Sequence, residues 1–355
     1  MKLIHTADLH LGARSTAHLT PEKARLRRRE LLEGFGRIAE LAVREGAAAV
    51  LIAGDLFDTA HPSREAIDYV LGTVRRTPDV RFLCLPGNHD GGRFPEVELP
   101  ENLTVFGAEW GKVCLGDVDV HAISPEGAIP YEALTLDPQR KSIVMLHGEK
   151  RDGGRNAEGA VLLSRLAGRG IDYLALGHYH RYQTGTLDER GVYAYSGTPS
   201  PHGFDEAFAG GVVLIDTDES PVEPRFLPIG SRPIEILEVT IGDGDDGRAI
   251  EAKILGAAAN IPPEAMLRVL LVGELSPDAA RPDTVLLTRA LLGRFFFAEV
   301  KDKTRLSIDP RDYEGAISLK GAFLRRVLAS SLSPEDREAV IAAGLAALRG
   351  EEVAE

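Results

Sequence analysis

The 355-residue chain has few cysteines, few aromatic residues and no long apolar segment. Cys84 and Cys114 each lie in an apolar stretch, which favours two small buried side chains over a disulfide or a redox pair. The absence of a run of about 18 apolar residues excludes a membrane-spanning helix. The N-terminus reaches Asp8 and His10 too early for a signal peptide, so we expect a cytoplasmic protein.

Basic residues are also scarce: 41 Lys and Arg stand against 54 Asp and Glu, a net charge of −13. This balance argues against a protein that holds nucleic acid by overall charge. It leaves open a protein that meets nucleic acid through bound metal cations and a local basic patch. The length and the 44% hydrophobic content indicate a globular protein of two or three domains.

Strand-like and helix-like segments alternate in the first half of the chain. The pattern predicts strands at 2–8, 48–55, 80–87, 142–148 and 173–178, and helices at 22–45, 63–76 and 157–168. It predicts hairpins at 111–124, 182–197 and 210–229. This alternation is typical of an α/β domain with largely parallel strands, either as one mixed sheet or as two packed sheets.

The pattern changes at residues 228–235, which contain two prolines and a glycine. Beyond this point we expect a small βαβαβ unit with helices at 248–258 and 283–293. A helical tail follows, and Ser333 and Pro334 give one of its helices a good start.

Polar residues follow the end of five of the predicted strands. The candidates, in chain order, are Asp8, His10, Asp55, Asn88, His147, His178 and His180. The carboxyl-terminal edge of an open α/β sheet is where ligands bind. Any one of these short motifs alone is more often a turn or a helix cap, but turns explain five such strand ends poorly.

The residue types indicate a metal centre. Aspartate, asparagine and histidine without cysteine suit Mn²⁺, Fe²⁺ or Zn²⁺ better than Ca²⁺. Seven ligands are too many for one tetrahedral ion and enough for two octahedral ions that share a bridge. Two ions about 3.5–4 Å apart are a standard device for the in-line attack of an activated water on a phosphate ester.

The ordered motifs "DLH", "GDLFD", "GNHD", "LH" and "GHYH", between residues 8 and 180, resemble the signature of calcineurin-like metallophosphoesterases. The resemblance implies an α/β fold, a four-layer αββα sandwich with two divalent metals at the strand ends. Mn²⁺ is the expected metal, with Fe²⁺, Zn²⁺ or Mg²⁺ as alternatives. It further implies that Asp8, His10, Asp55 and His180 hold one metal, and that Asn88, His147 and His178 hold the other, with Asp55 bridging. His89 would face the scissile phosphate, with Asp90 as its orienting carboxylate.

The later part of the chain resembles one branch of this superfamily. "GDLFDTA" and "GNHD" lack the Arg and Glu that mark protein Ser/Thr phosphatases, whereas "YAYSGTPSPHGFDE" (193–206) resembles the corresponding loop in DNA repair exonucleases of the SbcD type. This implies an exonuclease, also able to act as an endonuclease, in DNA repair and recombination. It would be a homodimer formed through 22–45 and 63–76. Its substrates would be double-stranded ends and single strands of DNA, and its partner an SbcC-like SMC-family ATPase.

The same resemblance implies three domains. A nuclease domain would span 1–230, an α/β capping domain that controls DNA access 231–308, and a helical segment for ATPase docking 309–355. Two other functions stay open. One is a phosphodiesterase for nucleotides or other small diesters. The other is a regulatory subunit with a vestigial site, against which the presence of all seven ligands argues.

The candidate DNA contacts fall in two places. Arg25, Arg27, Arg28 and Arg29 form the densest positive cluster in an acidic chain, and the alternative is a solvated helix face. Thr198, Ser200 and His202 lie in the loop after the last metal motif, where a solvated histidine is the alternative. His5 and His121 lie in apolar strands and are expected in the core.

Overall fold

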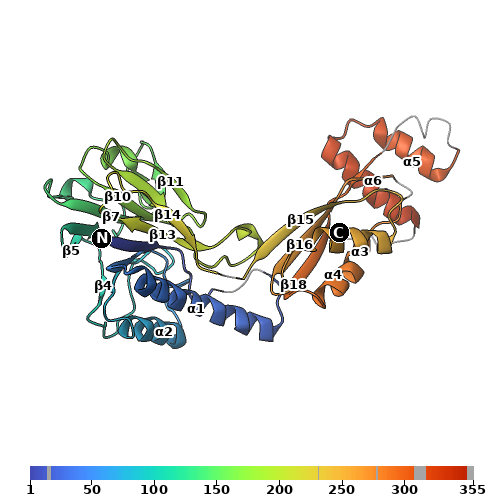
Figure 1. The fold of residues 1–355 in the computed structure, drawn as a ribbon. Coiled ribbons are helices and arrows are strands. Elements are labelled where there is room, and N and C mark those ends of the chain that lie inside the picture. The colour runs from blue at the N-terminus through green and yellow to red at the C-terminus, as the bar shows by residue number, and fades with distance from the viewer. Residues whose placement is uncertain (14–16, 231, 277–278, 308–316, 350–355) are drawn as a thin grey trace. The chain divides into compact units, whose positions relative to one another are not determined.

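The computed structural model describes residues 1–13, 17–230, 232–276, 279–307 and 317–349. The chain forms two compact units, Met1–Ile234 and Glu235–Glu355 (Figure 1). Parts of the expected docking segment, 309–316 and 350–355, lie outside the described residues, as does residue 308 at the end of the expected capping domain. The capping and docking roles of the second unit remain predictions.

Two six-stranded sheets form the first unit. One has the order β14 (Arg225–Pro228), β13 (Gly211–Asp216), β1 (Lys2–Thr6), β2 (Ala49–Ala53), β3 (Arg81–Leu85) and β4 (Leu103–Val105). The other has the order β11 (Gln183–Thr186), β12 (Val192–Tyr195), β10 (Tyr173–Gly177), β7 (Lys141–His147), β6 (Val118–Ala122) and β5 (Gly111–Leu115). Both have parallel centres, and the antiparallel pairs β5–β6, β11–β12 and β13–β14 confirm the three predicted hairpins.

The two sheets pack face to face through a fully buried apolar core. Leu51 and Leu83 of the first sheet join Val120, Met145 and Tyr173 of the second in one cluster. Central parallel strands are buried on both faces, which is why they read in the sequence as continuous apolar runs. This arrangement confirms the expected α/β sandwich.

Helices α1 (Pro21–Glu45) and α2 (Arg64–Arg75) confirm the helices predicted at 22–45 and 63–76, and they cover the outer face of the first sheet. The Thr20 hydroxyl accepts the backbone N–H of Lys23 at the start of α1. Gly46, with φ of 65°, ends the helix in the left-handed conformation that glycine adopts without strain. Phe35 of α1 packs on Phe82 of β3, with ring centroids 5.9 Å apart.

The predicted helix at 157–168 is wrong. Residues Ala160–Leu162 form a short strand, β9, that pairs in parallel with β8 (Glu149–Arg151) and continues into a 3-10 turn at Leu163–Arg165. Three consecutive apolar residues are buried here, which satisfies a buried strand rather than one face of a helix. Two further 3-10 turns are Tyr131–Ala133 and Phe204–Glu206.

The second unit has the predicted βαβαβ order. It contains β15 (Ile234–Thr240), α3 (Gly247–Ala257), β16 (Met266–Val272), α4 (Thr284–Leu292) and β18 (Phe297–Asp302), with sheet order β15-β16-β18. A short pair, β17 (Glu274–Leu275) with β19 (Arg305–Leu306), and the helices α5 (Leu319–Leu328) and α6 (Pro334–Arg349) complete it.

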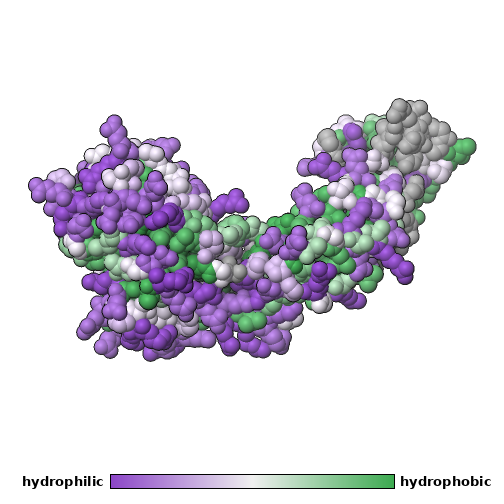
Figure 2. Space-filling view, viewed as in Figure 1, coloured by the Kyte–Doolittle hydropathy of each residue, from purple (hydrophilic) through white to green (hydrophobic). Residues whose placement is uncertain are grey.

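Hydrophilic and hydrophobic residues are both present on the surface, and the visible face of the first unit is largely hydrophilic (Figure 2). None of the helices within the described ranges is both long and apolar enough to cross a bilayer. Cys84 is buried, as expected, but Cys114 is exposed on β5, so that the prediction of two buried thiols was wrong for Cys114. His121 is buried, as expected, on β6.

His5 is a core histidine, as predicted: it is fully buried and its Nδ1 lies 2.8 Å from the Tyr173 hydroxyl. Burial lowers its pKa to about 3 from the ordinary 6.5. Between these two values the imidazole is protonated in the unfolded chain but neutral in the folded chain. His5 therefore leaves the free energy of unfolding undiminished above pH 6.5 and lowers it progressively as the pH falls towards 3.

We expect His5→Gln to remove this acid sensitivity. Between pH 6.5 and 5 the histidine should cost the native protein about 2 kcal/mol, at about 1.4 kcal/mol per pH unit. Urea unfolding at pH 7 and pH 5, with a chelator present throughout, measures the difference. The exposed His61→Gln is the control. An unchanged pH dependence in His5→Gln would contradict the assignment.

Candidate metal centre

The seven candidate ligands converge where the carboxyl ends of strands from both sheets meet. Asp8 and His10 follow β1, Asp55 follows β2, Asn88 follows β3, His147 ends β7, and His178 and His180 follow β10. Backbone hydrogen bonds tie the strand-end loops to one another: the N–H of Asp8 donates to Gly54 O (3.1 Å) and that of His10 to Asp55 O (3.0 Å). Likewise the Gly148 N–H donates to Gly177 O (3.1 Å).

The backbone is strained at these positions. Among the described residues, the non-glycine residues with positive φ are Asp8 (53°), His10 (45°), Asp55 (51°) and His178 (112°). Such conformations cost about 1–3 kcal/mol each and persist where the surrounding structure imposes them, commonly at functional sites. All four residues are candidate ligands, so the strain coincides with the predicted centre.

Glycines allow the close approach of the loops. A Cβ at Gly54 would overlap the Nδ1 atom of His147, and a Cβ at Gly87 would overlap the carboxylate of Asp55. The "AGD" and "PGN" motifs therefore need glycine because a ligand side chain occupies the space of the missing methyl group.

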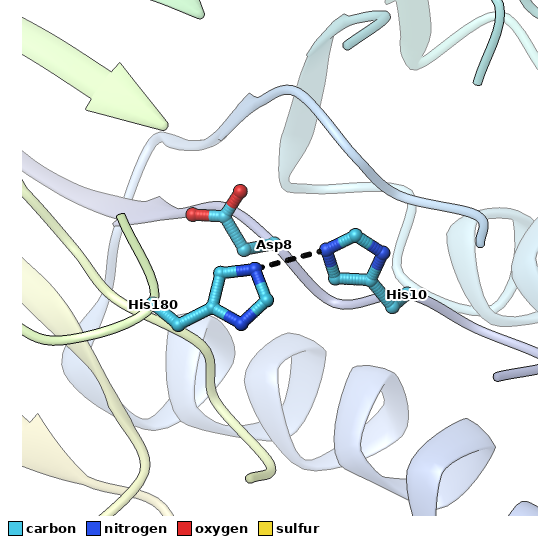
Figure 3. A group of neighbouring side chains, drawn as sticks. All are labelled: Asp8, His10 and His180. Carbon is cyan, nitrogen blue, oxygen red and sulfur yellow. Dashed lines mark hydrogen bonds between the residues drawn. The ribbon is translucent and has the colours of Figure 1, made fainter. Parts of the chain in front are cut away.

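Asp8, His10 and His180 form the first cluster (Figure 3). The Nε2 atoms of His10 and His180 lie 3.2 Å apart. Nδ1 of His10 lies 3.2 Å from the Asp58 carboxylate, and Nδ1 of His180 contacts the Glu206 carboxylate. A carboxylate beside each Nδ1 favours the tautomer that carries its proton there, which leaves both Nε2 atoms able to bind one cation.

The second cluster has the same character. His147 Nδ1 lies 3.0 Å from the Ala53 carbonyl, to which its N–H donates. Its Nε2 lies 2.9 Å from Asn88 Oδ1 and 3.2 Å from Asp55 Oδ2. Burial lowers the pKa of His147, but the Asp55 carboxylate raises it more, to about 9, so that a bound metal would replace a proton on Nε2. At metal–nitrogen distances of about 2.0–2.1 Å, neighbouring ligands of one ion lie about 3 Å apart. Both clusters therefore fit a divalent cation.

Asp55 lies between the clusters. Its Oδ2 is 3.2 Å from His147 Nε2 and 3.8 Å from His10 Nε2, and the side chain is 2% exposed. Burial raises the pKa of this carboxyl, but His147 and His10 lower it more, to about 2. A carboxylate that stays ionised and reaches both clusters fits the bridging role expected for Asp55.

Comparison with known proteins agrees with this geometry. The family model of calcineurin-like phosphoesterases matches residues 1–182, about half of the chain. The chain belongs to the calcineurin-like phosphoesterase family. It is therefore a metal-dependent phosphodiester hydrolase.

Relatives of this phosphoesterase include DNA repair proteins. The DNA double-strand break repair protein Mre11 of Saccharolobus solfataricus is 25% identical over 88% of this chain and 85% of its own length. Mre11 of Sulfolobus acidocaldarius is also 25% identical, over 68% of this chain and 67% of its own length. The metallophosphoesterase YhaO of Bacillus subtilis is 28% identical over 64% of this chain and 60% of its own length.

His178 holds a different position from the other six candidates. Its backbone N–H donates to both carboxylate oxygens of Asp8, at 2.9 and 3.0 Å. Its ring stands perpendicular to that of His147, with centroids 5.5 Å apart. The phosphoesterase thus places this imidazole beside the second cluster, while its backbone orients a ligand of the first.

Asp90 does not orient His89, and this expectation is wrong. The Asp90 carboxylate is buried and accepts the backbone N–H groups of Leu56 (3.2 Å), Phe57 (2.8 Å) and Gly87 (2.9 Å). Burial raises its pKa to about 6. Asp90 therefore braces the two strand-end loops that carry Asp55 and Asn88.

Asp58 is the carboxylate beside His89. Its Oδ1 lies 3.7 Å from His89 Nδ1 and 3.2 Å from His10 Nδ1. The rings of His10 and His89 meet edge to face, with centroids 4.5 Å apart. Asp58 is the last residue of the "GDLFD" motif. The motif predicts a metal ligand at Asp55 but no role for Asp58.

Four of the predicted DNA contacts are buried rather than exposed. Arg27 is 2% exposed and pairs with Glu30, and Thr198 and Ser200 are fully enclosed. His202 is also buried, with its ring centroid 5.6 Å from that of His10. The expectation that these residues reach DNA directly is wrong, and so is the alternative of a solvated His202. Arg25, Arg28 and Arg29 are exposed.

Glu206 was missed altogether. It contacts His180 from the end of the 3-10 turn Phe204–Glu206. One signal in the sequence could have indicated it, the "FDE" that closes the loop after the last metal motif. A glutamate there also suits a surface turn, so only the folded chain reveals the contact.

We expect Asp90→Ala to lower the stability of the protein and Asp58→Asn to lower its activity. Loss of an acceptor for three buried N–H groups should lower the free energy of unfolding by about 3 kcal/mol. Asp58→Asn should change it by less than about 0.5 kcal/mol, yet slow Mn²⁺-dependent hydrolysis of a chromogenic phosphodiester at least tenfold.

Denaturant unfolding and initial rates measure the two effects. If Asp90→Ala kept full stability and lost activity as Asp58→Asn does, Asp90 would act on the reaction as first predicted.

Proposed function

We propose that this phosphoesterase is a two-metal DNA nuclease that uses Mn²⁺. The observation that carries the proposal is that Asp55 joins the first and second clusters of candidate metal ligands, with His89 beside them. The similarity to Mre11 over most of the chain supports DNA as the substrate. The oxygen and nitrogen donors suit Mn²⁺, and no cysteine lies among them.

Two divalent ions, when bound, supply an activated water and positive charge for the phosphate. The chain's own residues hold and orient the reactants. Asp55 keeps the two ligand clusters together, and its Oδ1 accepts the backbone N–H of His89 at 2.9 Å. His89 is 47% exposed, so its ring is available to protonate the leaving oxygen, while Asp58 steadies its Nδ1.

Arg25, Arg28 and Arg29 are proposed to contact the DNA backbone. They project from α1, and Arg28 lines the same cavity of about 510 Å³ as Asp58. Local positive charge next to a catalytic site can bind phosphates even in an acidic protein. A homodimer formed through α1 and α2, and an SMC-family ATPase as partner, complete the proposal on the basis of the SbcD resemblance.

The direct test is an assay with three substrates: a labelled DNA duplex, a labelled single strand and bis(p-nitrophenyl) phosphate. We expect Mn²⁺-dependent shortening of DNA that a chelator abolishes. Hydrolysis of the small diester without cleavage of either DNA would contradict the proposal and identify an enzyme for small diesters.

The role of His89 predicts a separation of binding from chemistry. His89→Gln should reduce DNA cleavage by about 10²- to 10⁴-fold, since a positioned proton donor contributes that much. Elemental analysis should still find two Mn²⁺ per chain, because His89 is not a ligand. Loss of metal from His89→Gln would show that the residue holds a cation instead.

The arginine surface predicts a change in salt dependence. Each phosphate contact contributes about 0.9 to the slope of log affinity against log salt for duplex DNA. The triple variant Arg25→Ala, Arg28→Ala and Arg29→Ala should therefore lower the slope by about 2–3 units. Arg44→Ala, at the far end of α1, is the control, and an unchanged slope in the triple variant would exclude this surface.

A further inference from the structure

Glu206 connects the last metal motif to the loop that follows it. The side chain is 14% exposed, and its carboxylate contacts two histidines. One oxygen contacts His180 Nδ1. The other accepts the backbone N–H of His202 at 2.6 Å and lies 3.5 Å from its Nδ1.

We infer that Glu206 is a positioning residue of the metal centre. Its carboxylate accepts the Nδ1–H of His180, and so sets the tautomer and the ring plane that present Nε2 to the first metal. A histidine ligand whose second nitrogen donates to a carboxylate is held in orientation and is a stronger base. The inference rests on the proposed two-metal site and does not depend on which phosphodiester is cleaved.

The ring of His180 is the part that needs such a partner, since its backbone is held by the Thr198 N–H, which donates to His180 O at 2.8 Å. The residue lies in the loop after β10, and its side chain is 33% exposed. A free imidazole there could rotate, or carry its proton on Nε2, and either change would remove the lone pair from the metal. Two of the other expected ligands have their own Nδ1 neighbours, since His10 faces Asp58 and His147 faces the Ala53 carbonyl.

The loop that carries Glu206 is anchored from α1. The buried guanidinium of Arg27 donates to the Pro201 carbonyl and lies 3.0 Å from Glu30 Oε2. Glu30 in turn pairs with Arg232. A buried cation is costly unless it is paired and hydrogen-bonded, and here it holds the loop just before the turn that carries Glu206. This gives Arg27 a structural role in place of the predicted DNA contact.

The test measures Mn²⁺ affinity rather than activity. Calorimetric titration of the full-length wild type should resolve two ions. In Glu206→Ala one of the two affinities should fall by about 10- to 100-fold. Glu206→Gln should lose less, because its amide oxygen can still accept the Nδ1–H. The exposed neighbour Asp205→Ala is the matched control and should bind both ions as the wild type does.

A double-mutant cycle separates positioning from general destabilisation. In a His180→Ala background, Glu206→Ala should have no further effect on the weakened ion, since its partner is gone. In an Asn88→Ala background, which removes a ligand of the other ion, the full effect should remain. Equal effects in both backgrounds would overturn the inference.

The outcomes also separate this inference from the proposed function. Two Mn²⁺ bound with wild-type affinity by Glu206→Ala would overturn the role of Glu206 and leave the two-metal site standing. A wild-type chain that binds no Mn²⁺ would overturn both. If Glu206→Ala does not fold, Glu206→Met decides, since its side chain fills similar space but lacks an oxygen to accept the Nδ1–H, and unchanged affinities in that variant contradict the inference.

Discussion

Nitrogen and oxygen atoms that can bind a metal face one another at the strand ends of the two sheets, at separations of 2.9–3.2 Å. His10 and His180 direct Nε2 atoms at each other across 3.2 Å, and His147 Nε2 faces the oxygens of Asn88 and Asp55. A divalent cation bound between these atoms would take the place of the protons that such contacts otherwise need. The positive φ values at four ligand positions and the glycines beside them are the local costs of holding this arrangement.

The sandwich provides the rigidity that these contacts need. Parallel strands from both sheets end at one edge, so loops that are distant in sequence deliver their side chains to one place. Carboxylates around the site fall into distinct roles. Asp55 spans the two clusters, Asp58 reaches His10 and His89, Glu206 holds His180, and Asp90 closes the loops by accepting three backbone N–H groups.

The sequence predicted the metal centre best, because residues of the types that bind metals stand directly after predicted strands. The ligand residues could be predicted because each follows an apolar run, and their order matches a known signature. The sequence could not show which carboxylate lies beside the His89 ring. Asp90 is its neighbour in the sequence, whereas Asp58 comes near it only in the folded chain. Arg27 looked like one member of an exposed cluster, and only the packing of α1 against Pro201 shows it to be buried. The helix expected at 157–168 failed because three adjacent apolar residues satisfy a short strand equally well.

One measurement tests the central claim most directly: anomalous scattering from crystals grown with Mn²⁺, recorded at the manganese absorption edge. The account predicts two peaks at the strand ends. One should be bound by Nε2 of His10 and His180, the other by His147 Nε2 and Asn88 Oδ1, with the Asp55 carboxylate between them. A single peak, or ions bound elsewhere while these atoms still face one another, would contradict it.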